Sequence, residues 1–324
     1  MPPFAAGIDL GGTNIAAGVA DLASSRLVST VSRPTGRGRP WEAIARDMAA
    51  AVREAAAAAG LDPGQLAGVG VGIPGTCDQR GTALYVTNLG WTSLPLGPFL
   101  SRELGLPVRL SNDANCAVLA EGAAGAAVGY RDVAMVTIGT GLGSGFLIGG
   151  RLFEGGWGAG AEMGHMVIRS GEGPVCNCGR QGCWEVFASA TALIRQTREA
   201  AEANPHSLLW QQWGGKLDQI DGRTAFDAAA QGDPVARQVV DRYLWYLGEG
   251  LVSLVNIFRP QILLLGGGVS AQGEALLAPL RRRLAEDCYA GSLVPIPRLA
   301  VAALGNDAGI LGAALLLNPQ STVL

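Results

Sequence analysis

Four side chains that can bind a metal lie between residues 165 and 183. His165 is one of two histidines in the chain, and Cys176, Cys178 and Cys183 are three of its six cysteines. Zinc takes four tetrahedral ligands from thiolate sulfur and imidazole nitrogen, and a short loop punctuated by glycines can surround one ion. The cysteine run has no apolar periodicity that would bury three thiols in a core. The spacing therefore predicts a structural zinc site with a complete shell of four ligands.

Three carboxylates are candidates for other chemistry. Glu162 and Glu185 flank the cysteine loop and are not needed to complete the zinc shell. Asp113 stands in Ser-Asn-Asp-Ala-Asn at 111–115, where a predicted strand ends and an alanine-rich helix begins. Catalytic groups in α/β proteins commonly project from strand ends, so Asp113 is a candidate general base. An Asp in this place is also a preferred helix N-cap, and position alone does not separate the two roles.

Glycine-rich turns follow three predicted strands, at 11–14, 139–145 and 266–268. Glycine lets the backbone approach an anion closely, and successive N–H groups in a turn can bind phosphate. Thr13, Asn14 and Thr140 would add side-chain donors, and Asp9 suits a Mg²⁺ ion held through water beside the phosphates. The chain contains no Gly-x-x-x-x-Gly-Lys-Ser/Thr sequence, which excludes a P-loop.

The elements that must position these residues indicate an α/β fold. Expected strands cover 4–10, 15–20, 27–32, 66–73, 108–110, 133–138, 146–148 and 262–265, and expected helices cover 41–59, 114–127, 235–258 and 307–317. A strand, a glycine turn and a return strand occur twice, which predicts an internal duplication. We expect a smaller domain of residues 1–114 plus 306–324 and a larger domain of residues 115–305 that carries the zinc loop.

Composition narrows the classes of partner. The chain has 324 residues and a net charge of -3, without any block of like charge. A nucleic-acid partner or an acidic membrane surface is therefore not expected, and small molecules are. The first residues lack a basic segment followed by an apolar one, and the uncharged stretch at 133–150 is rich in glycine. We expect a cytoplasmic protein with no membrane span.

The motifs together resemble the ROK family, which contains repressors, open-reading-frame proteins and sugar kinases. They are Asp9-x-Gly-Gly-Thr-Asn14, Asn112-Asp-Ala-Asn115, Gly139-Thr-Gly-x-Gly143, Glu162-Met-Gly-His165, Cys176-x-Cys-Gly-x-x-Gly-Cys183-x-Glu185 and Gly266-Gly-Gly268. The resemblance spans nearly the whole chain in the right order. It implies an actin/hexokinase-like fold of two ribonuclease H-like α/β domains, with ATP and a hexose meeting in the cleft between them.

The resemblance also implies roles for individual residues. Asp113 becomes the general base that takes a proton from a sugar hydroxyl as the hydroxyl attacks the γ-phosphate of ATP. The residues that would contact the sugar are Gly75, Asn88, Asn112, Asp113 itself, Glu162, His165 and Glu185. His165 would use its second ring nitrogen for the sugar while the first binds zinc. A homodimer is implied as well.

The same resemblance implies ATP and Mg²⁺ as cofactors beside structural Zn²⁺. The first phosphate turn comprises Gly11, Gly12, Thr13 and Asn14, and Asp9 precedes it. Thr140 and Gly141 match the second phosphate turn, and Gly267 matches the adenosine side. These positions predict nucleotide binding.

The expected activity is that of an ATP:hexose 6-phosphotransferase, with glucose as the leading substrate. Many glucokinases of the family read Ala-Gly-Glu where this chain reads Gly160-Ala-Glu162, but the spacing from Glu162 to His165 is intact. The fructokinase-like branch commonly reads His-Pro-Glu, and Ala161 in place of proline argues against that branch. Kinases of N-acetylmannosamine, N-acetylglucosamine or another hexose stay open, as does polyphosphate in place of ATP.

Two non-enzymatic interpretations are less favoured. Repressors of the family carry a helix-turn-helix domain before the Asp-x-Gly-Gly motif, and eight residues precede Asp9 here. A catalytically inactive sugar sensor has no need of Asp113 and a complete set of phosphate turns. The pattern favours an enzyme.

Overall fold

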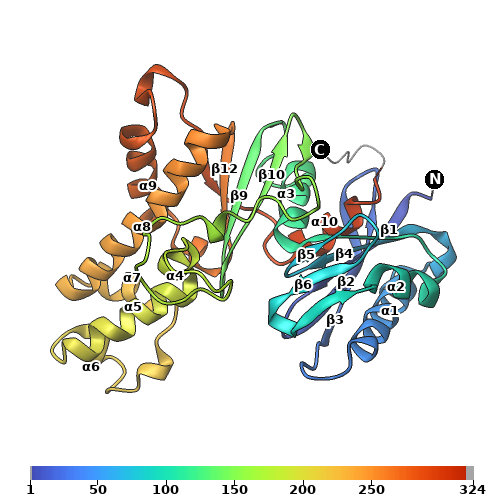
Figure 1. The fold of residues 1–324 in the computed structure, drawn as a ribbon, viewed down its shortest axis with the longest axis horizontal. Helices are drawn as coiled ribbons and strands as arrows, with labels where there is room; N and C mark the ends of the chain where they lie inside the picture. The colour runs from blue at the N-terminus through green and yellow to red at the C-terminus, as the bar shows by residue number, and fades with distance from the viewer. Residues whose placement is uncertain (1, 319–324) are drawn as a thin grey trace. The chain divides into compact units, whose positions relative to one another are not determined.

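The computed structural model describes residues 2–318, and its contacts divide the chain into two units (Figure 1). The first unit contains Met1–Met135, Gly145–Ala161 and Ala302–Leu324, and the second contains Val136–Ser144 and Glu162–Val301. The predicted domain boundary near residue 115 falls inside helix α3 (Asp113–Ala124) and stays a prediction. Residues 319–324 of the predicted smaller domain lie outside the described residues.

The first unit is built on a five-stranded sheet of order β3-β2-β1-β4-β8. Its strands are β1 (Phe4–Leu10), β2 (Asn14–Asp21), β3 (Arg26–Pro34), β4 (Leu66–Ile73) and β8 (Val108–Asn112). The first three strands pair antiparallel, whereas β4 and β8 run parallel to β1. β4 is an apolar run with one half-buried residue, as expected for a central parallel strand, and the edge strand β3 alternates.

Helices cover this sheet through small-residue faces. α1 (Trp41–Ala58) packs on β2 and β3, and α10 (Asp307–Leu315) packs on β1, β4 and α3. The backbone of α10 lies directly on the strands, because a Cβ at Gly7 would stand 1.9 Å from the carbonyl oxygen of Ile310. A Cβ at Gly70 would stand 1.7 Å from the carbonyl oxygen of Ala313. Gly7 of β1 and Gly70 of β4 therefore allow α10 to pack closely on the sheet.

The second five-stranded sheet has the order β11-β10-β9-β12-β13, with the unit boundary running through β9 and β10. Its strands are β9 (Val133–Ile138), β10 (Leu142–Ile148), β11 (Arg151–Leu152), β12 (Ile262–Gly266) and β13 (Arg298–Val301). Position by position, this order repeats that of the first sheet, with three consecutive strands followed by two later ones. The predicted duplicated α/β architecture is confirmed.

The second unit is mainly helical outside its sheet. Its helices are α4 (Glu185–Ala188), α5 (Ala190–Ala203), α6 (Leu208–Gln211), α7 (Thr224–Ala230), α8 (Pro234–Phe258) and α9 (Glu274–Asp287). Asp233 caps α8 by accepting hydrogen bonds from the N–H groups of Val235 and Ala236. α4, α5, α7 and α9 all pack on α8, which makes it the central helix of this unit. None of the described helices is long and apolar enough to cross a membrane.

The expected elements and the observed ones agree best where the apolar pattern is long. The strands at 4–10, 66–73 and 133–138 have the predicted bounds. The glycine turn predicted at 139–145 is shorter, because β10 already begins at Leu142. A three-stranded sheet of β5 (Thr76–Cys77), β6 (Ala83–Val86) and β7 (Trp91–Leu94), followed by α2 (Leu96–Leu104), was not predicted.

The close packing of α10 on β4 leads to a prediction for the variant Gly70→Ala. The added methyl group overlaps the backbone of α10, so we expect the free energy of unfolding to fall by about 3 kcal/mol or more. Urea denaturation measures the loss. Gly64→Ala is the matched control, because no described atom lies within 4 Å of a Cβ there, and it should change stability by less than about 1 kcal/mol. Equal stabilities of the two variants would contradict the packing described.

Candidate active site

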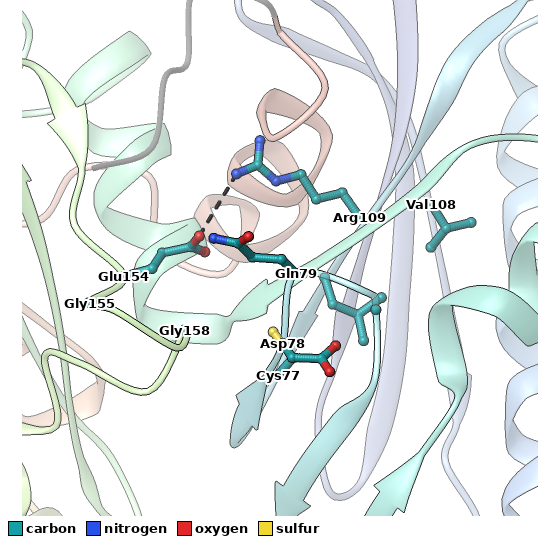
Figure 2. A pocket seen from close by; sticks show the side chains of 10 residues that line it. Cys77, Asp78, Gln79, Val108, Arg109, Glu154, Gly155 and Gly158 are labelled. Atoms are coloured by element: carbon teal, nitrogen blue, oxygen red, sulfur yellow. Dashed lines mark ion pairs between the residues drawn. The ribbon is translucent and has the colours of Figure 1, made fainter.

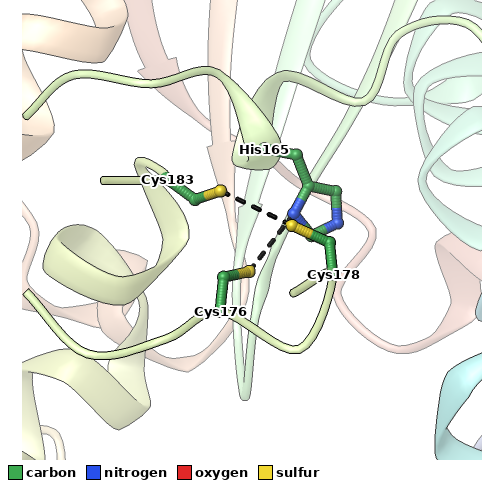
Figure 3. Close-up of side chains that lie close together, drawn as sticks. All are labelled: His165, Cys176, Cys178 and Cys183. Atoms are coloured by element: carbon green, nitrogen blue, oxygen red, sulfur yellow. Dashed lines mark hydrogen bonds between the residues drawn. The ribbon is translucent and has the colours of Figure 1, made fainter. Parts of the chain in front are cut away.

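The four predicted zinc ligands come together in the second unit (Figure 3). One ligand atom from each of His165, Cys176, Cys178 and Cys183 lies within 4.8 Å of the others. His165 Nδ1 is 3.4 Å from Cys176 Sγ, and Cys178 Sγ is 3.6 Å from Cys183 Sγ. Zinc bonds of about 2.0–2.3 Å place tetrahedral donor atoms about 3.3–3.8 Å apart. The four donors therefore fit one tetrahedral zinc ion.

Backbone contacts hold the cysteine loop in this shape. Cys176 N–H donates to the carbonyl oxygen of Arg180 at 2.8 Å, which closes the tight turn that carries Cys178. An isolated bridge joins Val167 to Cys183, and Trp184 N–H donates to the carbonyl of Met166 at 2.8 Å. The loop is thus tied to the segment that directly follows His165.

Glu185 connects the zinc loop to the second glycine turn. Its Oε2 accepts a hydrogen bond from Leu142 N–H at 2.9 Å, and its Oε1 lies 3.6 Å from Cys176 Sγ. A Cβ at Gly141 would stand 2.1 Å from Oε2, so a larger residue there would require the Glu185 carboxylate to move. The predicted sugar ligand Glu185 and the predicted phosphate turn at Thr140 and Gly141 are therefore direct neighbours.

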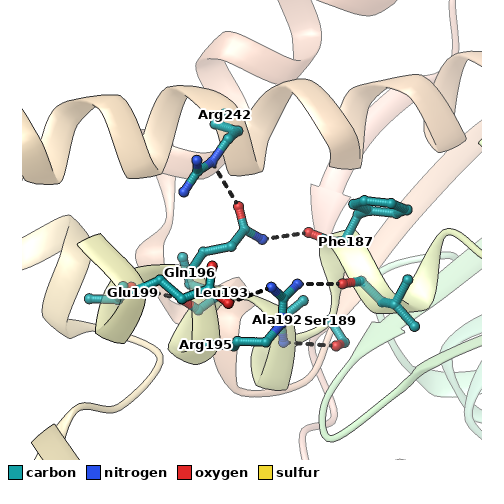
Figure 4. Close-up of polar contacts among 10 residues, drawn as sticks. Phe187, Ser189, Ala192, Leu193, Arg195, Gln196, Glu199 and Arg242 are labelled. Atoms are coloured by element: carbon teal, nitrogen blue, oxygen red, sulfur yellow. Dashed lines mark hydrogen bonds and ion pairs between the residues drawn. The ribbon is translucent and has the colours of Figure 1, made fainter. Parts of the chain in front are cut away.

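Glu185 is the first residue of α4, and a polar network fixes this short helix to α5 and α8 (Figure 4). The amide of Gln196 donates to the carbonyl of Phe187 at 2.9 Å and accepts from Arg242 Nε at 3.2 Å. Arg195 Nη2 donates to the carbonyl of Val186 at 3.0 Å. Three side chains from longer helices thus compensate for the few hydrogen bonds that a four-residue helix makes by itself.

Glu162 and His165 lie at the two ends of one 3-10 turn, Met163–His165. Met163 N–H donates to Ser144 Oγ at 3.0 Å, which anchors the turn on β10. Burial raises the pKa of Glu162, with His165 opposing the shift and Glu185 adding to it. Glu162, His165 and Glu185 therefore form one polar group beside the zinc donors.

In the first unit, three predicted site residues lie at the carboxyl edge of neighbouring parallel strands. Asp9 on β1 is in register with Gly72 on β4, and Gly72 is in register with Ser111 on β8. Asn112 and Asp113 follow Ser111 directly. The pKa of Cys116 is raised well above its usual value, chiefly by burial and then by the charges of Asp9 and Asp113. Both carboxylates are thus close to the Cys116 thiol.

At the end of β8, one residue is the N-cap of α3 and the next residue is the candidate base. Asn112 has extended backbone angles, and its Oδ1 accepts hydrogen bonds from Ala114 N–H at 2.8 Å and Asn115 N–H at 3.3 Å. Its amide also donates to the carbonyl of Gly75 at 3.2 Å. Asp113 is the first residue of α3, with Oδ1 2.8 Å from Ala114 N. Asn112 is the N-cap, so Asp113 is not required for that role.

Asp9 is held in an unfavourable place for a negative charge. Burial raises its pKa from 3.8 to about 6. A Cβ at Gly309 of α10 would stand 2.6 Å from Asp9 Oδ2, so the helix backbone covers the carboxylate. A buried carboxylate is stabilised by a nearby cation, which fits the predicted neighbourhood of Mg²⁺.

The predicted first phosphate turn, residues 11–14, is closed by its own backbone and by residues 35–37, which the sequence motifs did not include. Gly11 N–H donates to the carbonyl of Asn14 at 2.9 Å. Thr35 N–H donates to the carbonyl of Thr13 at 2.7 Å, and Thr35 Oγ1 donates to the carbonyl of Gly11 at 2.8 Å. Arg37 Nε donates to the carbonyl of Gly12. The Thr-Gly-Arg-Gly-Arg run at 35–39 was the available signal for this contact.

The remaining predicted positions lie on loops. Gly267 follows β12 with φ 83°, and a Cβ there would stand 2.3 Å from the carbonyl of Ile138, so glycine is required. Gly75 packs against β6, where a Cβ would stand 2.1 Å from the carbonyl of Tyr85. Asn88 is exposed in the 3-10 turn Thr87–Leu89. Their contacts to sugar or nucleotide stay predictions.

Known proteins match the chain over nearly its full length. The family model described as "ROK family" matches residues 5–320. A glucokinase from Streptomyces coelicolor is 37% identical over 98% of both chains. A crystal structure of a ROK family glucokinase from Streptomyces griseus, in complex with glucose and AMPPNP, is 39% identical, covers 97% of this chain and 98% of its own, and has a TM-score of 0.82.

A regulator is also similar, over a shorter range. The xylose repressor of Caldicellulosiruptor bescii is 31% identical over 77% of this chain and 62% of the repressor. The full-length matches to glucokinases and the family model agree with the motifs and with the two sheets of matching strand order. The chain belongs to the ROK family.

Proposed function

We propose that the protein is an ATP-dependent hexokinase that converts glucose to glucose 6-phosphate. The observation that carries the proposal is the end of β8, where Asn112 is the N-cap of α3 and Asp113 begins the helix at the carboxyl edge of the sheet. Similar full-length proteins are glucokinases, and one of them was solved with glucose and an ATP analogue. Both support an ATP-dependent glucose kinase over a regulator.

In the proposed reaction, Asp113 accepts the proton of the sugar 6-hydroxyl as its oxygen attacks the γ-phosphorus of ATP. A bond forms between this oxygen and phosphorus, the bond from phosphorus to the β,γ-bridging oxygen breaks, and ADP leaves. Phosphoryl transfer depends mainly on positioning and charge stabilisation, so a carboxylate within about 3 Å of the hydroxyl serves as orienter and base. The backbone N–H groups of the turns at 11–14 and 139–141 supply donors for the phosphate oxygens.

The polar group of the second unit explains selectivity in this proposal. Glu162, His165 and Glu185 present carboxylate and imidazole groups to sugar hydroxyls, and a sugar that lacks a matching hydroxyl leaves such groups unpaired. His165 Nδ1 and the three thiolates would hold a zinc ion, which would fix the imidazole ring so that its other nitrogen can face the sugar. Asp9 would hold Mg²⁺ through water, and the ion would supply charge neutralisation on the phosphates. The predicted homodimer and cytoplasmic location stay predictions.

A substrate panel tests the proposed function. We expect ADP release, in a coupled assay with ATP and Mg²⁺, to be fastest with glucose among a dozen hexoses that include N-acetylmannosamine, N-acetylglucosamine and fructose. Polyphosphate in place of ATP tests the donor. The absence of sugar-dependent ADP release would contradict the proposal, and a preference for an N-acetyl sugar would correct the substrate.

The assignment of Asp113 generates a prediction for Asp113→Ala. The variant should bind glucose with near wild-type affinity by calorimetry, because Glu162, His165 and Glu185 are unchanged. Its kcat should fall by at least about 100-fold, the contribution typical of a positioned base. Asp241→Asn, an exposed position on α8, is the matched control. Activity of Asp113→Ala within about tenfold of wild type would refute the role.

Asp9→Asn tests the buried carboxylate through its pH dependence. The pKa of Asp9 is about 6 in the folded protein and 3.8 for an ordinary aspartate. The folded state therefore binds more protons between these pH values, and stability falls as the pH rises through that window. Removing the charge should raise the free energy of unfolding at pH 7 by about 1–3 kcal/mol without nucleotide, and the gain should vanish near pH 4. Urea denaturation at both pH values measures it. A gain that is the same at both would contradict the burial effect.

Zinc analysis tests the donor cluster. We expect one zinc per chain by atomic emission after chelator washing, and loss of the metal in Cys178→Ser. Cys288→Ser removes a buried thiol outside the cluster and should keep the metal. Removing zinc should weaken glucose binding more than ATP binding, because Glu162 and Glu185 flank the ligands and the 11–14 turn belongs to the other unit. An equal loss of both affinities would assign the loop to overall folding.

A further inference from the structure

A carboxylate far from the motifs supports the strand end that carries Asp113. Glu154 lies after β11, and its Oε1 accepts a hydrogen bond from the hydroxyl of Ser111. Its Oε2 is 3.8 Å from Arg109 Nη2, and 12% of the side chain is exposed. Figure 2 shows Glu154 and Arg109 as an ion pair on the wall of a cavity of about 460 Å³. All of these residues belong to the first unit.

Ser111 is the point at which this contact reaches the candidate base. It is fully buried, it precedes Asn112 and Asp113, and its Oγ lies 3.5 Å from Asn115 Nδ2. The Oδ1 atom of Asn115 is buried without a hydrogen-bond partner among the residues described. The hydroxyl of Ser111 has a single proton to donate, and Glu154 accepts it. Glu154 is therefore the acceptor for the buried hydroxyl of Ser111 under the first turn of α3.

The same network reaches α10. Arg109 Nη1 donates to the carbonyl of Leu316, the residue that ends α10, at 3.1 Å. Arg109 and Ser111 both belong to β8, so Glu154 contacts one strand at two alternate positions. Two contacts on one strand resist both sliding and rotation of its end. A shift of about 1 Å at a reacting group costs about 100-fold in rate, so such support has a measurable effect.

We propose that Glu154 is a positioning residue that holds the end of β8 so that the Asp113 carboxylate meets the sugar hydroxyl. This inference rests on the proposed kinase function. Glu154 acts through Ser111 and touches neither sugar nor nucleotide. Its loss should therefore slow phosphoryl transfer more than it weakens either substrate.

The experiment compares Glu154→Ala, Glu154→Gln and Ser111→Ala with the wild type. Glu154→Ala should lower kcat by about 10–100-fold, with the KM values for glucose and ATP and the calorimetric Kd for glucose within about threefold. Glu154→Gln should recover most of the loss, because its amide oxygen still accepts from Ser111. Ser111→Ala should reproduce the defect, and the Ser111→Ala, Glu154→Ala double variant should be no slower than the worse single variant. Glu54→Ala, which breaks an exposed pair with Arg33, is the control.

Two results for the variants would overturn the inference. One is an unchanged kcat in Glu154→Ala and Ser111→Ala. Another is a joint fall of kcat, glucose affinity and melting temperature that glutamine does not rescue, which would mark a merely structural contact. If Glu154→Ala does not fold, Ser111→Ala and Glu154→Gln decide by the same criteria. A wild-type protein without kinase activity would refute the proposed function and this inference with it, whereas an active wild type with unaffected variants refutes the inference alone.

Discussion

The cap at Asn112 is the interaction on which the chemistry of the first unit depends. One amide oxygen accepts the N–H groups of Ala114 and Asn115, so the start of α3 is satisfied one residue before the carboxylate. Asp113 Oδ1 lies 2.8 Å from the same Ala114 N–H, but the N-cap position itself is taken by Asn112. The parallel register of β1, β4 and β8 brings Asp9 to the same sheet edge. The carboxylates that we propose as the base and as the Mg²⁺ site thus lie at strand ends, beside one helix cap.

In the second unit, Glu185 connects three parts of the predicted site. This side chain starts a four-residue helix, accepts the N–H of Leu142 beside the glycine turn, and lies against a thiol of the zinc cluster. The turn at Thr140 and Gly141 and the cysteine loop are therefore not independent. A metal that fixes Cys176 also limits where Glu185 and the adjoining turn can move. In the proposed function, a bound zinc ion would therefore influence substrate binding while it takes no part in the proton transfer.

The spacing of motif residues and the hydrophobic periodicity of the sequence predicted those features that depend on residues close together in the chain. The zinc donors are separated by a few residues on a glycine-rich loop, and long apolar strands such as 66–73 have the bounds expected. The strands of the small sheet have two to four residues, too few to show a period. Asn112 and Asp113 are equally good caps, so only backbone geometry separated them. The contacts of Arg37 with Gly12 and of Glu154 with Ser111 join segments that are distant in sequence, and spacing along the chain does not predict which segments pair.

We propose that the protein transfers the γ-phosphate of ATP to the 6-hydroxyl of glucose. The ³¹P NMR spectrum of the product formed from glucose, ATP and Mg²⁺ tests it most directly, because coupling to the two protons on C6 identifies the ester position. We expect the spectrum to show ADP and a single new phosphate ester whose phosphorus is coupled to these protons. A spectrum that shows only ADP and inorganic phosphate, or an ester on another carbon, would contradict it.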